Sequence, residues 1–258
     1  MIALSPAWTY SFFLILIRTS GMLVSAPLLS HKGIPSWTKA GFAVFFALVL
    51  VPLQKDALPP APEQMGTLVA GVFRELLFGL ALGLAMNLVF IGIQMSSHIL
   101  GLQMGFGLGG VFDPVSGVEG GVFDQFYALL VTLVFFTING HYMVIQTLAE
   151  TVRAVPPGTF DPLSLHSSTG LAGLMAGLTV SAVRIAMPVM VALFLADLGL
   201  GFVARTVPQM NVFAVGMPVK IVVGVLVMVA ALPMTMQVMN GVISTSLAGS
   251  SQRLLGAG

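Results

Sequence analysis

Long apolar runs separated by short polar connectors dominate the chain. The first run extends from Trp8 to Leu29 and contains one charged residue, Arg18. The run from Met65 to Leu100 is compatible with helix throughout, and it is longer than the about 20 residues that one upright membrane span needs. Because backbone polar groups inside a bilayer must be paired within the protein, such runs predict helices. The pattern therefore indicates an all-α integral membrane protein.

The other apolar runs are shorter or interrupted. Gly41 to Leu53 is too short for a perpendicular span, so we expect half of a hairpin or an interfacial helix. Gln125 to Glu150 is interrupted by an Asn-Gly-His triplet. Leu171 to Val203 is too long for one upright helix, and Pro188 within it predicts a kink or a break. The last run, Ile221 to Leu247, also contains a proline.

A glycine-rich stretch from Gly101 to Gly121, GLQMGFGLGGVFDPVSGVEGG, separates the two halves of the chain; we call it the central segment. It carries eight glycines and one proline. Glycine costs about 1 kcal/mol against alanine in a helix interior, so the composition predicts a loop. Irregular backbone at membrane depth is tolerated only where protein covers it or where it lines a wet cavity. The central segment is therefore a candidate functional site.

Composition narrows the class of protein further. Hydrophobic residues make up 57% of the chain, charged residues only 7%, and the mean hydropathy is +1.02. A soluble domain of this length would need more polar surface. The net charge of +1, without a basic cluster, argues against a nucleic-acid partner. The absence of cysteine excludes disulfides and thiolate metal sites.

The basic residues do not fix an orientation in the membrane. Cytoplasmic loops usually carry an excess of Lys and Arg. Neither placement of the central segment satisfies this rule, whether or not Gly41 to Leu53 crosses the bilayer. We therefore expect short, broken and tilted helices that pack against protein rather than independent spans in lipid.

Ionisable residues inside apolar sequence need partners, because an unpaired charge there is costly. Arg18 predicts a snorkelling or partner-paired cation rather than a substrate-binding group. Arg184, Asp197 and Arg205 also stand in or close to apolar sequence. On a continuous helix, Asp197 and Arg205 lie near one side. For these three residues we expect a structural ion pair, which a neighbouring subunit could complete.

Small residues and methionines suggest specific packing roles. Gly79 and Gly83 form a small-xxx-small pattern, which favours close contact between helices. Met95 and Met104 flank the central segment, where flexible side chains can pack as a yielding seal.

No motif for catalysis or cofactor binding stands out. Three glycines of the central segment match G-x-G-x-x-G, but they follow a membrane-type helix and lack the acid expected about 20 residues later. The four histidines have no metal-ligand spacing. Ser96, Ser97, His98 and Asp113 are residue types too common to indicate a nucleophile. We expect no enzyme, no cofactor and no metal site.

Two sequence blocks resemble the FliR family of flagellar export-gate proteins, whose virulence counterpart is called SctT. They are GLQMGFGLGGVFDPVSG and RTVPQMNVFAVGMPVKI. The resemblance covers essentially the whole chain and implies a single export-gate domain over residues 1–258. Its most specific part is an assembly and structural motif consisting of Arg205, Pro208, Gln209, Asn211, Phe213, Gly216, Pro218 and Lys220.

The resemblance implies bent helical hairpins that assemble with FliP and FliQ into a helical export gate, with FlhB around the cytoplasmic entrance. Unfolded flagellar proteins would pass through this gate, which lies in the bacterial inner membrane within the flagellar basal body. The resemblance also implies a channel plug formed by Met104, Gly105, Phe106, Gly107, Gly109, Gly110, Phe112, Asp113 and Pro114. Gly107 stands where the family usually has a polar residue, so polar contacts from that position are not expected.

Two alternatives remain at this point. A small-molecule secondary transporter subunit would also contain broken helices and buried ions, but the two halves of this chain show no convincing repeat. A virulence counterpart of the SctT type would differ in its cargo, and the sequence NVFAVGMPVKI favours the flagellar form.

Overall fold

A computed structural model describes residues 5–30, 33–54, 58–62, 64–106, 121–160, 168–209 and 211–254. The regular structure in this part of the chain is helical, without strands, which confirms the all-α prediction. The helices are α1 (Pro6–Ser25), α2 (Ser36–Leu50), the short 3-10 helix η1 (Val51–Gln54), α3 (Met65–Gln103), α5 (Val122–Thr137), α6 (Gly140–Ala154), α7 (Ser168–Thr206) and α8 (Val212–Leu254).

Five of the described helical stretches are long and apolar enough to cross a membrane, and the number becomes six if α5 and α6 together make one span. The predicted interruption between these two helices is confirmed: α5 ends at Thr137, and Asn139 adopts a left-handed conformation with φ 57° before α6 begins. An asparagine tolerates this conformation better than most residues. The polar triplet therefore marks a real break in an apolar run.

One expectation about helix length needs correction, and of the kink or break predicted at Pro188 only the break is absent. The run at Gly41–Leu53 belongs to a longer helical stretch, because α2 begins at Ser36 and continues into η1 as a 19-residue candidate span. Because the first turn of α2 contains polar residues, the apolar run in the sequence begins later than the helix itself. The helix α7 passes through Pro188 without a break and is 39 residues long. A proline is tolerated in membrane-type helices because other groups can satisfy the backbone groups that it frees.

The chain divides into two compact units. The first comprises Met1–Leu88, Asn139–Met175 and Ser244–Gly258, and the second comprises Val89–Ile138 and Ala176–Ile243. Each unit draws on segments that are distant in the sequence. The single export-gate domain over residues 1–258 stays a prediction.

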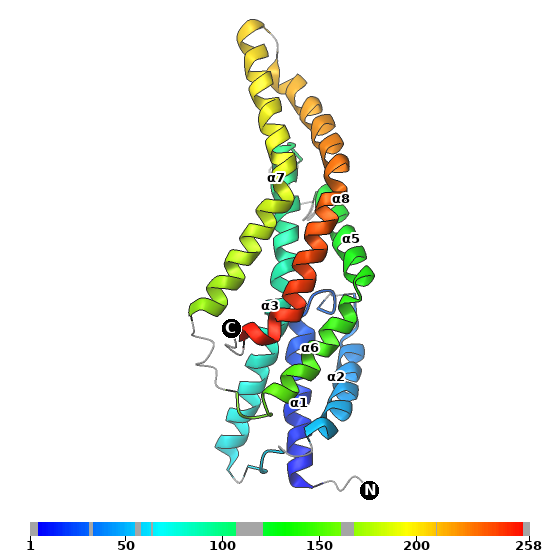
Figure 1. The fold of residues 1–258 in the computed structure, drawn as a ribbon, viewed down its shortest axis with the longest axis vertical. Helices are drawn as coiled ribbons and strands as arrows, with labels where there is room; N and C mark the ends of the chain where they lie inside the picture. The colour runs from blue at the N-terminus through cyan, green and yellow to red at the C-terminus, as the bar shows by residue number, and fades with distance from the viewer. Residues whose placement is uncertain are drawn as a thin grey trace. The chain divides into compact units, whose positions relative to one another are not determined.

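In the first unit, α1 packs beside α2 and closely against the N-terminal half of α3 (Figure 1). A Cβ atom at Gly79 would overlap the carbonyl oxygen of Arg18, and one at Gly83 would overlap atoms of the same neighbouring helix. On the α1 side, a Cβ atom at Gly21 would lie 3.0 Å from the Leu76 carbonyl oxygen. The predicted role of the two α3 glycines in close helix contact is confirmed.

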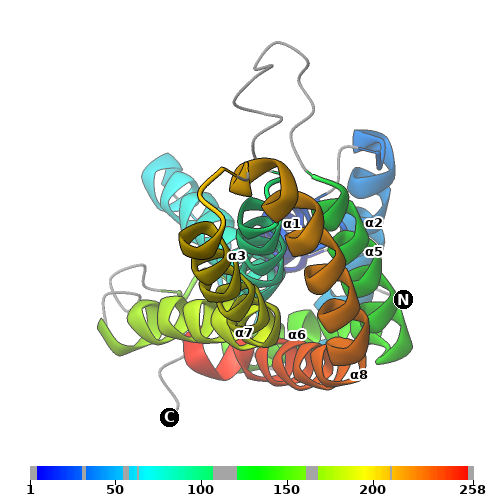
Figure 2. The same ribbon diagram turned by 90° about the horizontal axis from the view of Figure 1, so that it is seen from above.

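The second unit contains most of the antiparallel hairpin of α7 and α8, together with the C-terminal part of α3 and the helix α5 (Figure 1 and Figure 2). The two hairpin helices are close enough for Gly216 of α8 to approach the Leu200 side chain of α7, where an added Cβ would lie at 3.2 Å. Asn211 precedes α8, and its side-chain oxygen accepts a hydrogen bond from the Ala214 amide at 3.2 Å. This bond caps the first turn of α8.

Candidate functional site at the end of α3

The helix α3 ends in a defined backbone motif at the start of the central segment. The Phe106 amide donates to the Gly101 carbonyl at 2.9 Å, and the Gly105 amide donates to the Leu102 carbonyl at 3.1 Å. This pair of bonds is the Schellman pattern, which requires a left-handed residue after the helix. Gly105 supplies it with φ 88°. The loop therefore begins at Met104, three residues later than the predicted start at Gly101.

Two methionine side chains pack against glycines beside this turn. Met104 is completely buried. It fills the space above Gly224 of α8, where an added Cβ would overlap the Met104 methyl group. Met217 of α8 lies over Gly105, with its methyl group 3.5 Å from the ideal Cβ position. The Met104 side chain thus packs as a knob against α8, whereas Met95 is exposed.

The helix α5 begins directly after Gly121, and Asp124 holds its first turn. Asp124 Oδ2 accepts a hydrogen bond from the Gly121 amide at 2.9 Å, which satisfies a donor at the helix start. Its other oxygen, Oδ1, accepts a hydrogen bond from the Ser97 hydroxyl of α3 at 2.5 Å. His98 Nδ1 lies 3.8 Å from Asp124 Oδ2, and the His98 side chain is 67% exposed.

This geometry does not resemble a nucleophile activated by a base. Ser97 donates its proton toward a carboxylate that also caps a helix, and Ser96 donates to the Ile93 carbonyl at 2.6 Å. The Asp113 of the sequence-based set lies outside the described residues. Among the described residues, no group of three His, Cys, Asp or Glu side chains is arranged to hold a metal ion.

Three of the predicted plug residues are described. Met104 is buried, Gly105 forms the turn, and the Phe106 ring meets the Phe123 ring edge-on with centroids 5.2 Å apart. The other six predicted plug residues lie outside the described residues: Gly107, Gly109, Gly110, Phe112, Asp113 and Pro114. Their role as a plug stays a prediction.

The predicted assembly motif surrounds the join between α7 and α8. Arg205 lies in the last turn of α7, and Pro208 and Gln209 are exposed in the turn after it. Pro218 is accommodated inside α8 rather than ending it. The remaining motif residues are Asn211, which caps α8, Phe213, which lies in α8, Gly216, which faces Leu200, and Lys220, which forms an ion pair.

Lys220 pairs with Asp197 across the hairpin, with Nζ 2.5 Å from Oδ1. The expected ion pair at Asp197 is therefore present within the chain, and its partner is on α8 rather than on α7. Neither side chain is buried, since Lys220 is 26% and Asp197 49% exposed. The sequence pattern placed Asp197 and Arg205 near one side of a single helix. The ion pair that the structure contains instead joins two helices, α7 and α8.

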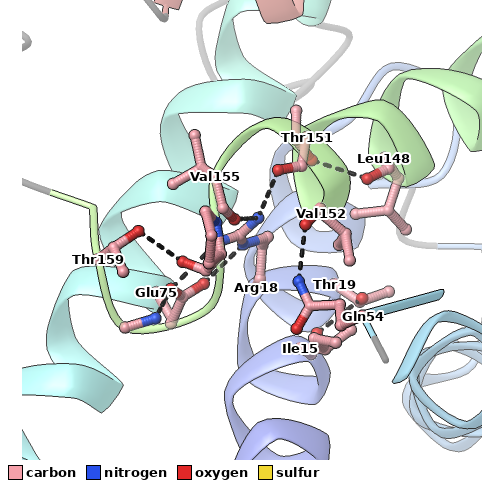
Figure 3. A network of polar contacts seen from close by, with 12 residues as sticks. Ile15, Arg18, Thr19, Gln54, Glu75, Leu148, Thr151, Val152, Val155 and Thr159 are labelled. Atoms are coloured by element: carbon pink, nitrogen blue, oxygen red, sulfur yellow. Dashed lines mark hydrogen bonds and ion pairs between the residues drawn. The ribbon is translucent and has the colours of Figure 1, made fainter. Parts of the chain in front are cut away.

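A second polar site lies in the core of the first unit, where Arg18 pairs with Glu75 of α3 (Figure 3). Arg18 Nε donates to Glu75 Oε2 at 2.6 Å, and its Nη2 donates to Oε1 at 3.1 Å. Both side chains are 0% exposed. The planar guanidinium also lies over the Phe78 ring, with Cζ 4.7 Å from the centroid. The prediction of a partner-paired Arg18 is confirmed.

The same ion pair reaches the end of α6. Arg18 Nη1 donates to the carbonyls of Thr151 at 3.0 Å and Val155 at 3.1 Å (Figure 3). The last carbonyls of a helix lack partners within it and favour a nearby cation. Glu75 Oε1 accepts a further bond from the Gly158 amide at 2.8 Å. One buried pair therefore joins α1, α3, the end of α6 and the chain that follows it.

The sequence did not reveal Glu75 or Asp124 as partners. Glu75 is 57 positions from Arg18, and Asp124 is 27 positions from Ser97. The sequence contained one indication: both residues are acids inside or beside an apolar run, where an ionised group needs a partner.

Long apolar helices, close glycine contacts and internally paired charges define this chain as an all-α membrane protein. Its sequence matches the family described as "Bacterial export proteins, family 1" over residues 9–246, and the chain belongs to that family. It is 30% identical over 239 residues to the flagellar biosynthetic protein FliR of Bacillus subtilis, covering 92% of each chain.

Two further relatives agree. The chain is 30% identical over 230 residues to the flagellar biosynthetic protein FliR of Pectobacterium carotovorum, covering 88% of this chain and 86% of the relative. It is 28% identical over 228 residues to the protein of the same name from Escherichia coli, with the same coverage. The resemblance found in the two sequence blocks is thereby confirmed.

Proposed function

We propose that the chain is a subunit of the flagellar type III protein export gate and forms, with FliP and FliQ homologues, the channel through which unfolded flagellar proteins leave the cytoplasm. The observation that carries this proposal is the family match over residues 9–246, joined by relatives named flagellar biosynthetic protein FliR. The location implied is the inner membrane, within the basal body, with an FlhB homologue at the cytoplasmic side. The subunit acts by shape and packing and carries no catalytic residue.

The surface of the α7–α8 hairpin supports an assembly role. In the most apolar 18 residues of Thr179–Thr206 and of Ala214–Thr245, only 22% and 17% are buried, against 61% in the most apolar 18 residues of α3. Exposed residues on the two helices include Phe194, Phe202 and Leu226. Exposed large apolar side chains on membrane-type helices suit a contact with lipid or with other proteins. Small residues on the same helices suit close helix contact.

Co-expression with FliP and FliQ homologues tests the proposal directly. We expect a stable complex after mild detergent extraction, and we expect the chain to restore motility and secretion of flagellar proteins in cells that lack their own FliR. A chain that is stably inserted but neither binds these partners nor restores secretion would contradict the proposal.

Expression without partners provides a second test. We expect an unstable or aggregating chain, because the apolar hairpin faces then lack cover. A monodisperse, protease-resistant monomer in detergent would count against the assembly role.

Within this gate, we propose that the central segment is the plug that keeps small solutes from crossing. Met104 and Phe106 supply apolar side chains at its described end, and Gly105 gives the left-handed turn from which it leaves α3. Shortening the chain between Gly107 and Gly120 should leave the complex assembled but permeable to small ions, while export continues in part. Conductance across membranes that contain the purified complex measures this, and an assembled, shortened complex that stays tight would refute the plug.

A further inference from the structure

Arg184 is an exposed cation far from the ends of an apolar helix. It belongs to α7, whose apolar run begins 13 positions before it, at Leu171, and ends 19 positions after it, at Val203. At a rise of about 1.5 Å per residue, these ends lie about 20 Å and about 29 Å away along the helix axis. An arginine near the end of a span can extend to the polar headgroups. Arg184 is not in that position, because several helical turns of apolar sequence separate it from either end.

The side of α7 that carries Arg184 is not covered by the rest of the described chain. Val180, four positions before Arg184, and Met187, three positions after it, lie on the same side of the helix and are exposed. Ala186 and Val189, on the opposite side, are buried. The cation therefore stands within an apolar surface, with exposed apolar side chains before and after it along the helix.

Other ionised groups inside apolar helices of this chain have partners within the chain. Arg18 pairs with Glu75, and Lys220 pairs with Asp197. Among the residues that the structure describes, none forms an ion pair or a side-chain hydrogen bond with Arg184. A charge among apolar groups is costly unless it is paired. The counter-charge of Arg184 must then come from another molecule.

We propose that Arg184 binds a carboxylate, an Asp or Glu side chain on an apolar helix of a FliP or FliQ homologue. This inference rests on the proposed function, in which the chain assembles with these partners. A carboxylate accepts two parallel hydrogen bonds from a guanidinium, and the apolar side chains beside Arg184 would keep water away from the pair. A lipid phosphate carries the same sign of charge, but it lies in the headgroup layer, beyond the ends of an apolar run rather than beside its interior.

Co-expression of the chain with FliP and FliQ homologues measures the effect on assembly. We expect Arg184→Gln to lower the yield of complex several-fold, and Arg184→Glu to lower it further because two like charges would then meet. The matched control is Arg153→Gln. Arg153 is also exposed, but it lies in the last turn of α6, where the helix carbonyls favour a cation, so its loss should leave the yield unchanged.

A zero-length crosslink tests the contact itself, even where a charge variant is poorly inserted. Arg184→Lys keeps the positive charge and supplies an amine, which a carbodiimide couples to a touching carboxylate as an amide, the reagent taking up the water that is lost. We expect a covalent product of this variant with a FliP or FliQ homologue that the unchanged chain does not form. Mass spectrometry identifies the acid, and exchanging that acid for arginine should restore assembly with Arg184→Glu.

The outcomes separate this inference from the proposed function. If the unchanged chain forms the complex, Arg184→Gln and Arg184→Glu assemble in normal yield, and Arg184→Lys gives no product or a product with a second copy of the chain, the inference alone is overturned. It is also overturned if Arg184→Gln leaves the subunit yield unchanged but removes anionic phospholipid from the purified complex, because the cation then binds a lipid headgroup. If the unchanged chain does not bind these partners, the proposed function fails, and the inference falls with it.

Discussion

The buried pair of Arg18 and Glu75 and the exposed pair of Lys220 and Asp197 show two different uses of charge in one apolar chain. The first is fully buried, bidentate and bonded to the backbone of α6 and of the chain after it. The second is a single contact across a hairpin whose apolar faces are largely uncovered. A buried pair must satisfy all its partners within the chain, whereas an exposed pair can exchange partners. The pair in the first unit is therefore satisfied entirely within the chain, whereas the hairpin pair stands on a surface that other molecules can reach.

The largest effect is expected from breaking the buried pair. Glu75→Leu leaves the Arg18 cation without its counter-charge, which should cost about 3–5 kcal/mol in the free energy of unfolding. Replacing both residues, with Arg18→Met and Glu75→Leu, should recover much of this loss. Denaturant titration of the detergent-purified complex measures both variants. The control is Arg74→Ala, at the exposed neighbouring position; an equal loss there would remove the distinction between the two kinds of site.

A smaller effect is expected from the close contact of α1 and α3. Gly79→Ala places a methyl group against the Arg18 carbonyl, and overpacking of this kind should cost about 1–3 kcal/mol. Gly101→Ala is matched to it, because it lies on the same helix with nothing within 4 Å of the added Cβ. That variant should be neutral or more stable by up to about 1 kcal/mol, from the better helix propensity of alanine. Identical thermal midpoints for the two complexes would contradict the packing argument.

The next smaller effect on stability is expected from removing the cap of α8. Asn211→Ala removes the bond to the Ala214 amide and should cost about 1 kcal/mol. We expect this loss to reduce the yield of complex with FliP and FliQ homologues before it changes which cargo is exported, and we expect the same order of effects for Arg205→Ala. Gln209→Ala, in the exposed turn, serves as the control. Normal complex yield together with altered cargo selection would assign Asn211 a different role.

The smallest effect is expected from the hairpin ion pair. A partly exposed pair contributes about 0.2–1 kcal/mol, so the coupling between Lys220→Met and Asp197→Asn in a double-mutant cycle should fall in that range. The cycle is measured by the same denaturant titration as the buried pair. A coupling as large as that of Arg18 and Glu75 would show that the hairpin pair is covered in the assembled complex, which would sharpen the comparison.

The sequence by itself determined the class of protein and most of the helices. The run from Met65 to Leu100 became α3, which ends at Gln103, and the polar triplet at Asn139 became the break before α6. Gly79 and Gly83 were identified as a contact surface, and they are one. These features depend on local composition and periodicity, which can be read directly from the amino-acid sequence.

Only the tertiary structure decided which polar groups meet. The partners Arg18 and Glu75, Ser97 and Asp124, and Lys220 and Asp197 lie on different helices, and each pairing depends on the register in which the two helices pack. A shift of one helical turn, about 5.4 Å, would separate any of these hydrogen-bonded atoms. Hydropathy records that a charge inside an apolar run needs a partner, but the choice of partner depends on distances between helices, which a linear pattern does not contain.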